Sequence, residues 1–234
     1  MSCVAIIPAR GGSKRIPRKN IKEFCGKPMI AWSIEAAKAS GCFDQIVVST
    51  DDEQIASIAF QYGATIPFMR PPALADDFTG TLPVIHHAVA WLNEFDAPVD
   101  YACCIYATAP FVSADDLKHG FQLIKETHSN YAFSVTSYAF PIQRAIRVTD
   151  NGRIAMFNPE HFHTRSQDLE EAWHDAGQFY WGTADAWCGE RPVFGDGSVP
   201  VKLPRHRVQD IDTPEDWVRA EWLFKAMLNE DDLK

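Results

Sequence analysis

The amino-terminal segment, residues 4–20, constrains the fold of this chain more than any other stretch. Residues 4–7 form a short apolar run with branched side chains, which is typical of a buried strand in a parallel sheet. The run ends at Pro8 and passes into a turn that contains Gly11 and Gly12. Strand, glycine turn and following helix come in the order that an anion-binding loop requires. The segment therefore predicts a first βα unit whose loop binds phosphate.

Basic side chains are concentrated in this loop. Seven of the chain's 22 basic residues lie between positions 10 and 27, where Glu23 is the single acidic residue, in a protein of formal net charge −9. Because such a cluster repels itself, we expect a polyanion to bind there. Glycine lets backbone N–H groups approach phosphate oxygens closely, and arginine binds those oxygens in pairs. The loop matches neither the Walker pattern nor the dinucleotide-binding glycine pattern. Solvated surface charge is the alternative interpretation.

Composition sets the class of protein. A chain of 234 residues with 46% hydrophobic and 23% charged residues can form one large α/β domain with a full core. We expect neither membrane insertion nor a signal peptide, because the first apolar run is too short to span a bilayer. Six cysteines without C-x-x-C spacing predict reduced thiols in a cytoplasmic protein. The acidic net charge argues against a nucleic-acid partner.

Short apolar runs alternate with segments of helical periodicity along most of the chain. Strands are predicted at residues 4–7, 45–50, 101–106, 132–137, 177–182 and 199–203, and helices at 28–39, 51–62, 81–95, 113–127 and 214–228. Ser113 and Asp116 read as a capping box, and Thr213 stands in the N-cap position before Pro214. Residues 229–234 are expected to fray. The alternation predicts an α/β fold with a mainly parallel sheet between two helical layers.

One segment interrupts this alternation. Residues 143–149 and 153–157 are strand-like and flank Asp150-Asn151-Gly152, which is a strong hairpin signal. Residues 158–174 are polar and irregular. We therefore expect an inserted arm at about residues 140–175.

Two aspartates precede the last predicted helix. If residues 208–211 are extended, Asp210 and Asp212 point to the same side, because residues two apart share a face of a strand. Such a pair suits Mg²⁺, which prefers one or two carboxylates together with phosphate oxygens and water. The alternative is that Asp210 is solvated in a loop and Asp212 favours the helix N-terminus.

Three segments together resemble the nucleotide-sugar cytidylyltransferases, above all the CMP-sialic acid synthetase group. They are the basic glycine loop at residues 4–20, the pattern R-P-x-x-L-A-x-D at residues 70–77, and D-I-D-T-x-x-D at residues 210–216. The resemblance covers almost the whole chain. It implies a Rossmann-like, three-layer nucleotidyltransferase fold in a single domain, residues 1–234, with CTP as substrate and Mg²⁺ as cofactor. It also implies a homodimer whose arm reaches across to the partner's sugar site.

The resemblance assigns roles residue by residue. Nucleotide contacts fall on Ala9, Arg10, Gly11, Gly12, Ser13, Lys14, Asn20, Arg70, Thr79 and Thr81. Catalytic roles fall on Arg10, Lys14, Lys19 and Asp212, and magnesium ligation falls on Asp210 and Asp212. Predicted sugar contacts are Tyr106, Arg144, Arg165, Gln178, Phe179 and Tyr180, with Trp181 as a further aromatic candidate. Core packing is the alternative for the aromatic side chains, and a solvated surface position is the alternative for the two arginines.

Two segments bear on the identity of the sugar. Sialic acid synthetases usually carry Gln-Pro-Thr-Ser-Pro after the third strand, where this chain has Tyr106 followed by Ala-Thr-Ala-Pro. Together with H-D-A-G-Q-F-Y-W-G at residues 174–182, this looks most like the pseudaminic acid cytidylyltransferases. That branch implies attack of a nonulosonic acid's anomeric hydroxyl on the CTP α-phosphate. Sialic, legionaminic and 3-deoxy-octulosonic acids are alternative sugars, and a non-catalytic nucleotide sensor is the alternative from another class.

Overall fold

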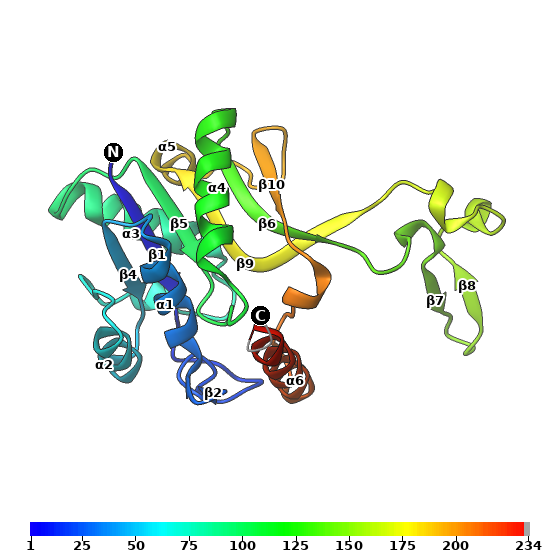
Figure 1. The fold of residues 1–234 in the computed structure, drawn as a ribbon, viewed down its shortest axis with the longest axis horizontal. Coiled ribbons are helices and arrows are strands. Elements are labelled where there is room, and N and C mark those ends of the chain that lie inside the picture. The colour runs from blue at the N-terminus through cyan, green and yellow to red at the C-terminus, as the bar shows by residue number, and fades with distance from the viewer. Residues whose placement is uncertain (232–234) are drawn as a thin grey trace.

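A six-stranded sheet forms the centre of the protein, with strand order β10-β6-β9-β5-β1-β4 (Figure 1). The structure is a computed structural model that describes residues 1–231. The strands of the sheet are β1 (Cys3–Pro8), β4 (Gln45–Ser49), β5 (Tyr101–Ile105), β6 (Tyr131–Ser137), β9 (Trp173–Thr183) and β10 (Ser198–Lys202). β9 is antiparallel to β5 and β6, and the other neighbouring pairs run parallel. The predicted α/β fold with a mainly parallel sheet is confirmed.

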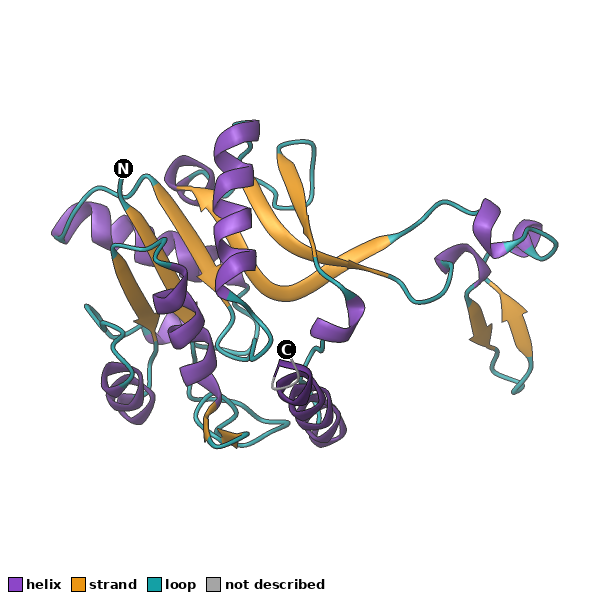
Figure 2. Cartoon of the chain, in the orientation of Figure 1, coloured by secondary structure: helices purple, strands orange, loops and turns teal. Residues whose placement is uncertain are grey.

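Helices cover both faces of this sheet (Figure 2). The helices are α1 (Met29–Ser40), α2 (Glu53–Gln61), α3 (Thr81–Phe95), α4 (Ala114–Thr127), α5 (Ala184–Cys188) and α6 (Pro214–Asp231). One apolar core cluster joins the sheet to α1, α2 and α4, and a second joins its other face to α3 and α5. Because the strands are covered on both sides, they read as continuous apolar runs in the sequence.

The predicted helix boundaries follow from local capping chemistry. Gly41 ends α1 in the left-handed conformation, with φ 62°. Ser113 Oγ accepts a hydrogen bond from Asp116 N at 3.1 Å and begins α4. α6 extends beyond the predicted end to Asp231, and residues 232–234 of the tail predicted to fray lie outside the described residues.

The arm is the part of the chain that leaves the sheet between β6 and β9 and projects to one side (Figure 1). It contains the hairpin of β7 (Ile146–Val148) and β8 (Ile154–Met156) and the short helices η2 (Ile142–Arg144), η3 (Pro159–His161) and η4 (Ser166–Asp168). The observed arm begins two residues and ends three residues before the predicted boundaries of about 140 and 175. Ser137 pairs with Trp173, so the sheet continues on both sides and the arm comprises residues 138–172.

The remaining short elements lie around the carboxyl ends of the strands. They are β2 (Glu23–Phe24), β3 (Lys27–Pro28), η1 (Pro72–Leu74) and η5 (Arg205–Arg207). A third apolar cluster includes Ile16, Phe24 and Phe111 together with Trp217 and Phe224 of α6. It therefore docks the C-terminal helix against the loop that follows β1. Among residues 1–231, none of the helices combines the length and apolar character that a bilayer crossing requires.

Gly182 tests the packing between β9 and α5. A methyl group at this position would lie 2.4 Å from Trp187 Nε1 and 2.8 Å from Tyr131 Cδ1, both of which are buried. We expect Gly182→Ala to lower the free energy of unfolding by about 1–3 kcal/mol, because overpacking forces these side chains to shift. Urea denaturation would measure the change. Gly195→Ala is the control, since its nearest atom lies 4.0 Å away, and an equal loss in both variants would contradict the steric argument.

Candidate active site

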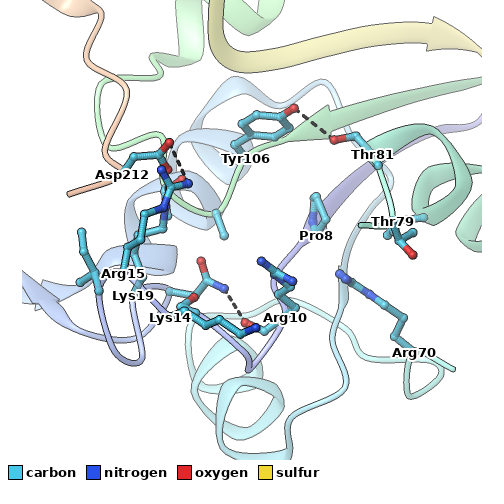
Figure 3. A pocket seen from close by; sticks show the side chains of 17 residues that line it. Pro8, Arg10, Lys14, Arg15, Lys19, Arg70, Thr79, Thr81, Tyr106 and Asp212 are labelled. Atoms are coloured by element: carbon cyan, nitrogen blue, oxygen red, sulfur yellow. Dashed lines mark hydrogen bonds and ion pairs between the residues drawn. The ribbon is translucent and has the colours of Figure 1, made fainter. Parts of the chain in front are cut away.

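A cavity of about 280 Å³ lies at the carboxyl ends of β1 and β5 (Figure 3). This is the edge of an α/β sheet where ligands bind, because the loops that follow the strands converge there. The wall consists of Pro8, Arg10, Ser13, Lys14, Arg15, Ile16, Lys19, Asn20, Arg70, Thr79, Gly80, Thr81, Val84, Tyr106, Ala107, Thr108 and Asp212. Four segments distant in sequence therefore contribute to one site.

Hydrogen bonds from β4, from the residues after it and from Asn20 hold the backbone of the loop after β1. Ala9 N donates to Ser49 O and Gly11 N donates to an Asp51 carboxylate oxygen, each at 2.9 Å. Asn20 is buried, and its Nδ2 donates to Arg10 O at 2.9 Å. Ala9, Gly11 and Gly12 do not belong to the cavity wall, whereas Ser13 and Asn20 do.

Glycine is required at position 11 because the Asp52 side chain lies close to its backbone. A methyl group there would lie 2.8 Å from an Asp52 carboxylate oxygen. Asp52 also caps α2 by accepting a hydrogen bond from Ile55 N at 2.9 Å, and it pairs with Arg18. The Arg18 hydrogen bonds lower the pKa of Asp52. Arg18 is thus engaged at the start of α2 and does not line the cavity.

Acidic residues from other segments offset the positive charge of the loop. Arg10 Nη1 lies 2.7 Å from Asp77 Oδ1, and Lys14 pairs with the other oxygen of the same carboxylate. These hydrogen bonds, that of Lys14 foremost, lower the pKa of Asp77. Arg15 pairs with Asp212 at 3.0 Å. The local sequence shows only the positive charges of this loop, whereas in the folded protein acidic residues from other segments neutralise part of that charge.

Asp76 shapes the loop that carries Asp77. Its carboxylate accepts hydrogen bonds from Phe78 N at 3.0 Å and from both Thr79 N and Thr79 Oγ1 at 2.7 Å. These bonds, with that of the Thr79 hydroxyl largest, lower the pKa of Asp76. The carbonyl oxygen of Asp76 accepts a hydrogen bond from Arg10 Nη1 at 2.6 Å. The loop is therefore bound directly to the cationic loop across the cavity entrance.

The two ends of the chain meet at the cavity wall. Lys19 Nζ donates to Ile211 O at 2.7 Å and lies 3.3 Å from Asp212 Oδ1. Asp210 is exposed and is not part of the wall, so the structure does not bring both predicted metal ligands into the cavity. Desolvation and then the neighbouring charge of Asp212 raise the pKa of Asp210. Residues 208–212 form no regular strand, so the strand geometry that would place the two carboxylates on one face is absent.

A metal ion at this site would take most of its ligands from a bound substrate of the protein and few from the protein itself. Within residues 1–231, no group of three or more His, Cys, Asp or Glu side chains converges on one point. Asp212 at the wall, with Asp210 two residues away, offers hard oxygen donors that suit Mg²⁺ held largely by phosphate. The donor set therefore fits a nucleotide-bound Mg²⁺.

Arg70 brings a buried positive charge to the cavity. It is 5% exposed, its Nε donates to Ser49 Oγ at 3.1 Å, and its Nη2 donates to Ser49 O. Burial lowers its pKa to about 10, so the guanidinium remains charged at neutral pH. A charge held at the edge of a cavity in this way is available to a polar or anionic ligand.

The predicted sugar contacts on β9 and after β5 differ in their distance from the cavity. Tyr106 lines the cavity, and Tyr180, 5% exposed, lies behind it with the ring centroids 5.4 Å apart. Phe179 and Trp181 are fully buried in the core that joins the sheet to α4. These two side chains therefore pack in the core and do not face the cavity, in contrast to the prediction. Gln178 is 2% exposed, and its Nε2 donates to a backbone carbonyl outside the cavity wall.

Arg144 and Arg165 lie on the arm, which projects away from the central sheet (Figure 1). Arg165 Nε pairs with Asp168 at 2.7 Å within the arm. Neither arginine lines the cavity of its own chain. The sequence also did not single out Asp77, Arg15 or Thr108 as site residues; Asp77 was visible only as the final position of the pattern at residues 70–77.

The fold and its cation-lined cavity define a nucleotidyltransferase. A family profile described as Cytidylyltransferase matches residues 4–177, and the chain belongs to this family. It is 46% identical over 97% of both chains to the pseudaminic acid cytidylyltransferase of Campylobacter jejuni subsp. jejuni serotype O:2. It is 35% identical to the CMP-N,N'-diacetyllegionaminic acid synthase of Legionella pneumophila, over 96% of this chain and 97% of that one.

Solved structures support the fold. The structure of CMP:2-keto-3-deoxy-manno-octonic acid synthetase complexed with CTP superposes with a TM-score of 0.70 at 16% identity, covering 97% of this chain and 100% of that one. At this identity the likeness bears on the architecture alone, and it agrees with the sheet and helical layers described above.

Asp77 offers a direct test of the charge balance at the cavity. Because its carboxylate competes with phosphate for Arg10 and Lys14, we expect Asp77→Asn to lower the dissociation constant for CTP severalfold, more at low salt. Isothermal titration calorimetry would measure the affinity. Asp96→Asn is the control, since Asp96 is exposed and forms no ion pair within residues 1–231. Weaker CTP binding by Asp77→Asn would show that Asp77 assists the nucleotide rather than competing with it.

Proposed function

We propose that this protein converts CTP and pseudaminic acid into CMP-pseudaminic acid and diphosphate. The observation that carries this proposal is the meeting of the glycine-containing cationic loop with Asp212 at one cavity. The 46% identity to a pseudaminic acid cytidylyltransferase over 97% of both chains supports the choice of sugar. We treat residues 1–234 as a single nucleotidyltransferase domain with an inserted arm.

The triphosphate would bind at the loop after β1. Arg10, Lys14 and Lys19 supply the positive charge, and the Gly12 N–H supplies a backbone donor, whereas the Ser13 N–H already donates to Gly11 O at 3.0 Å. CTP phosphates would replace the Asp77 carboxylate on Arg10 and Lys14. The base and ribose would then extend toward Arg70, Thr79 and Thr81 on the opposite wall, with Ala9, Gly11 and Asn20 acting as supports of the loop.

Asp210 and Asp212 would hold the metal. Members of the cytidylyltransferase family commonly use a divalent ion, and we infer Mg²⁺ from the hard oxygen donors and the polyphosphate substrate. When bound, Mg²⁺ neutralises phosphate charge and favours in-line geometry at the α-phosphate. Asp210 must turn from its exposed position to join Asp212.

The chemistry of the chain's own residues would be positioning and electrostatic stabilisation. The anomeric hydroxyl of the sugar attacks the α-phosphate and diphosphate leaves from the opposite side. Arg10, Lys14 and Lys19 stabilise the charge that grows on the leaving group. Asp212 accepts the proton of the attacking hydroxyl. The Tyr106 side of the cavity receives the sugar.

The arm would complete the site in a homodimer. Its hairpin exposes apolar side chains, including Val148 at 75% and Ile154 at 71%, and Phe140 beside it is 83% exposed. Such a surface marks a protein interface. Arg144 and Arg165 would then reach the cavity of the partner and bind the sugar carboxylate. We also propose a cytoplasmic location, in keeping with six free cysteines.

The direct experiment is a diphosphate-release assay with CTP, Mg²⁺ and a panel of nonulosonic acids. Pseudaminic acid is expected to give the largest kcat/KM. Preference for legionaminic acid would favour the activity named for the 35% identical relative, and preference for sialic acid would likewise revise the substrate. CTP binding without turnover of any sugar in the panel would indicate a nucleotide sensor instead.

Lys14 tests the role of the loop in catalysis. We expect Lys14→Ala to reduce kcat/KM about 10²–10³-fold, because a donor aimed at the leaving group is lost. Steady-state kinetics with CTP and the preferred sugar would measure this. Lys118→Ala on α4 is the matched control, since Lys118 is also exposed and ion-paired, with Asp115 at 3.2 Å. Unchanged turnover in Lys14→Ala would remove this side chain from the mechanism.

Ile154 tests the role of the arm. We expect Ile154→Lys to convert the dimer to a monomer, because a charge replaces an exposed apolar side chain at the proposed interface. Light scattering would give the mass, and kcat/KM should fall together with dimerisation. Phe60→Lys is the control, since Phe60 is 70% exposed on α2 far from the arm. A monomeric wild-type protein with full activity would contradict this role.

A further inference from the structure

The segment that carries both predicted metal ligands, residues 208–212, joins η5 to α6 (Figure 1). Its second end is anchored, because Ile211 is 1% exposed within the third apolar cluster and its carbonyl oxygen accepts a hydrogen bond from Lys19 Nζ at 2.7 Å. Asp212 N also donates to Asp216 Oδ2 at 3.2 Å. The end of the segment that carries Asp212 is therefore fixed by its neighbours.

Arg207, the residue before this segment, is held through its side chain. Nη1 donates to Asp116 Oδ2 at 2.6 Å and Nη2 donates to Asp116 Oδ1 at 3.1 Å, so one carboxylate binds the guanidinium with two hydrogen bonds. The two side chains are mostly shielded from solvent, at 22% and 15% exposed. Asp116 is itself fixed at the start of α4, where Ser113 Oγ donates to its Oδ2 at 2.6 Å. The ion pair therefore ties η5 to α4.

A second contact holds the backbone of Arg207. Gln178 Nε2, from β9, donates to Arg207 O at 2.6 Å, and Gln178 is 2% exposed. Within residues 1–231, Gln178 Oε1 is buried without a hydrogen-bond partner, so the donor of this amide is the group that fixes the side chain. Arg207, Asp116 and Gln178 are here named the arginine clamp. The clamp fixes residue 207 at two points, from α4 and from the sheet.

We propose that Arg207 is a positioning residue for the metal, because the arginine clamp fixes the first end of residues 208–212 and so keeps Asp210 within reach of an ion on Asp212. The inference rests on the proposed function, in which both carboxylates bind Mg²⁺. Four residues, 208–211, separate the clamp from Asp212, and a span this short that is fixed at both ends has few backbone conformations. Asp210 then joins Asp212 by a rotation of its side chain, with little further loss of backbone entropy.

Loss of the clamp is expected to weaken metal binding and to leave the metal-free affinity for the nucleotide largely intact. Arg207 also carries a charge, and its removal weakens the binding of any anion, with or without metal. The ratio of the dissociation constants for CTP in EDTA and in Mg²⁺ cancels this general effect. Gln178→Met makes the same test without a change of charge, because it removes the donor to Arg207 O.

Isothermal titration calorimetry with CTP and no sugar measures this ratio in wild type, Asp116→Asn, Arg207→Gln, Gln178→Met and the double variant of Asp116→Asn with Arg207→Gln. We expect Mg²⁺ to tighten CTP binding by the wild type, and each single variant to lose about tenfold of that tightening, as for other groups that orient metal ligands. The double variant should lose no more than either of its single variants, because the two side chains act as a pair. High Mg²⁺ concentrations should restore the turnover of the preferred sugar by Asp116→Asn.

Thr183→Ala is the matched control, because Asp116→Asn also disturbs the cap of α4. Thr183 Oγ1 caps α5 by accepting a hydrogen bond from Ala186 N at 3.1 Å, and none of the hydrogen bonds within residues 1–231 joins its side chain to residues 205–212. It reports the effect of a lost cap on the melting temperature and should leave the CTP ratio unchanged. Unchanged ratios in the clamp variants, or ratios that fall with the melting temperature in Thr183→Ala as well, would overturn the clamp alone. A wild-type protein whose CTP affinity does not respond to Mg²⁺ would overturn the proposed metal site and the clamp with it.

Discussion

The contact between Lys19 and the segment before α6 joins the two ends of the chain, and the cavity depends on it. Lys19 Nζ donates to Ile211 O at 2.7 Å and lies 3.3 Å from Asp212 Oδ1. Apolar packing beneath this contact holds it in place, since Phe24 and Trp217 meet edge to face with centroids 5.4 Å apart. Burial of aromatic rings supplies stability that an exposed ion pair would not. The docking of α6 thereby sets one wall of the site.

Ion pairs between the cationic loop and acidic residues of other segments hold this site together. Cations of the loop after β1 repel one another, and Asp52, Asp77 and Asp212 from separate segments offset that repulsion. In the proposed function, a nucleotide would exchange with these carboxylates without reorganising the backbone, because their ion pairs already hold the loop in place. Asp77 binds two cavity cations, Arg10 and Lys14, through one carboxylate, and under the proposed function it is the group that phosphate would displace. Asp52 serves the fold instead, because it caps α2 and closes the space beside Gly11.

The sequence was informative where local chemistry decides the outcome. Ser113 and Gly41 mark helix ends through capping and left-handed geometry, which neighbouring residues alone determine. It failed for Phe179, since strand aromatics can face a ligand or a helix and only the packing against α4 separates the two. It also placed the end of the arm three residues too far along the chain, because Trp173 pairs with Ser137 although residues 158–174 carry no strand signal of their own.

What the sequence by itself determined was the order of the main strands and helices, the cationic glycine loop after the first strand and the family pattern at both ends, because apolar periodicity, caps and glycine turns act over a few residues. The tertiary structure alone decided which charges meet. Asp77 with Lys14, Asp212 with Lys19 and Asp175 with Tyr180 are pairs that depend on how separate segments converge. Ion pairs and hydrogen bonds form between groups that are close in space, and the local sequence does not determine which distant segments come close.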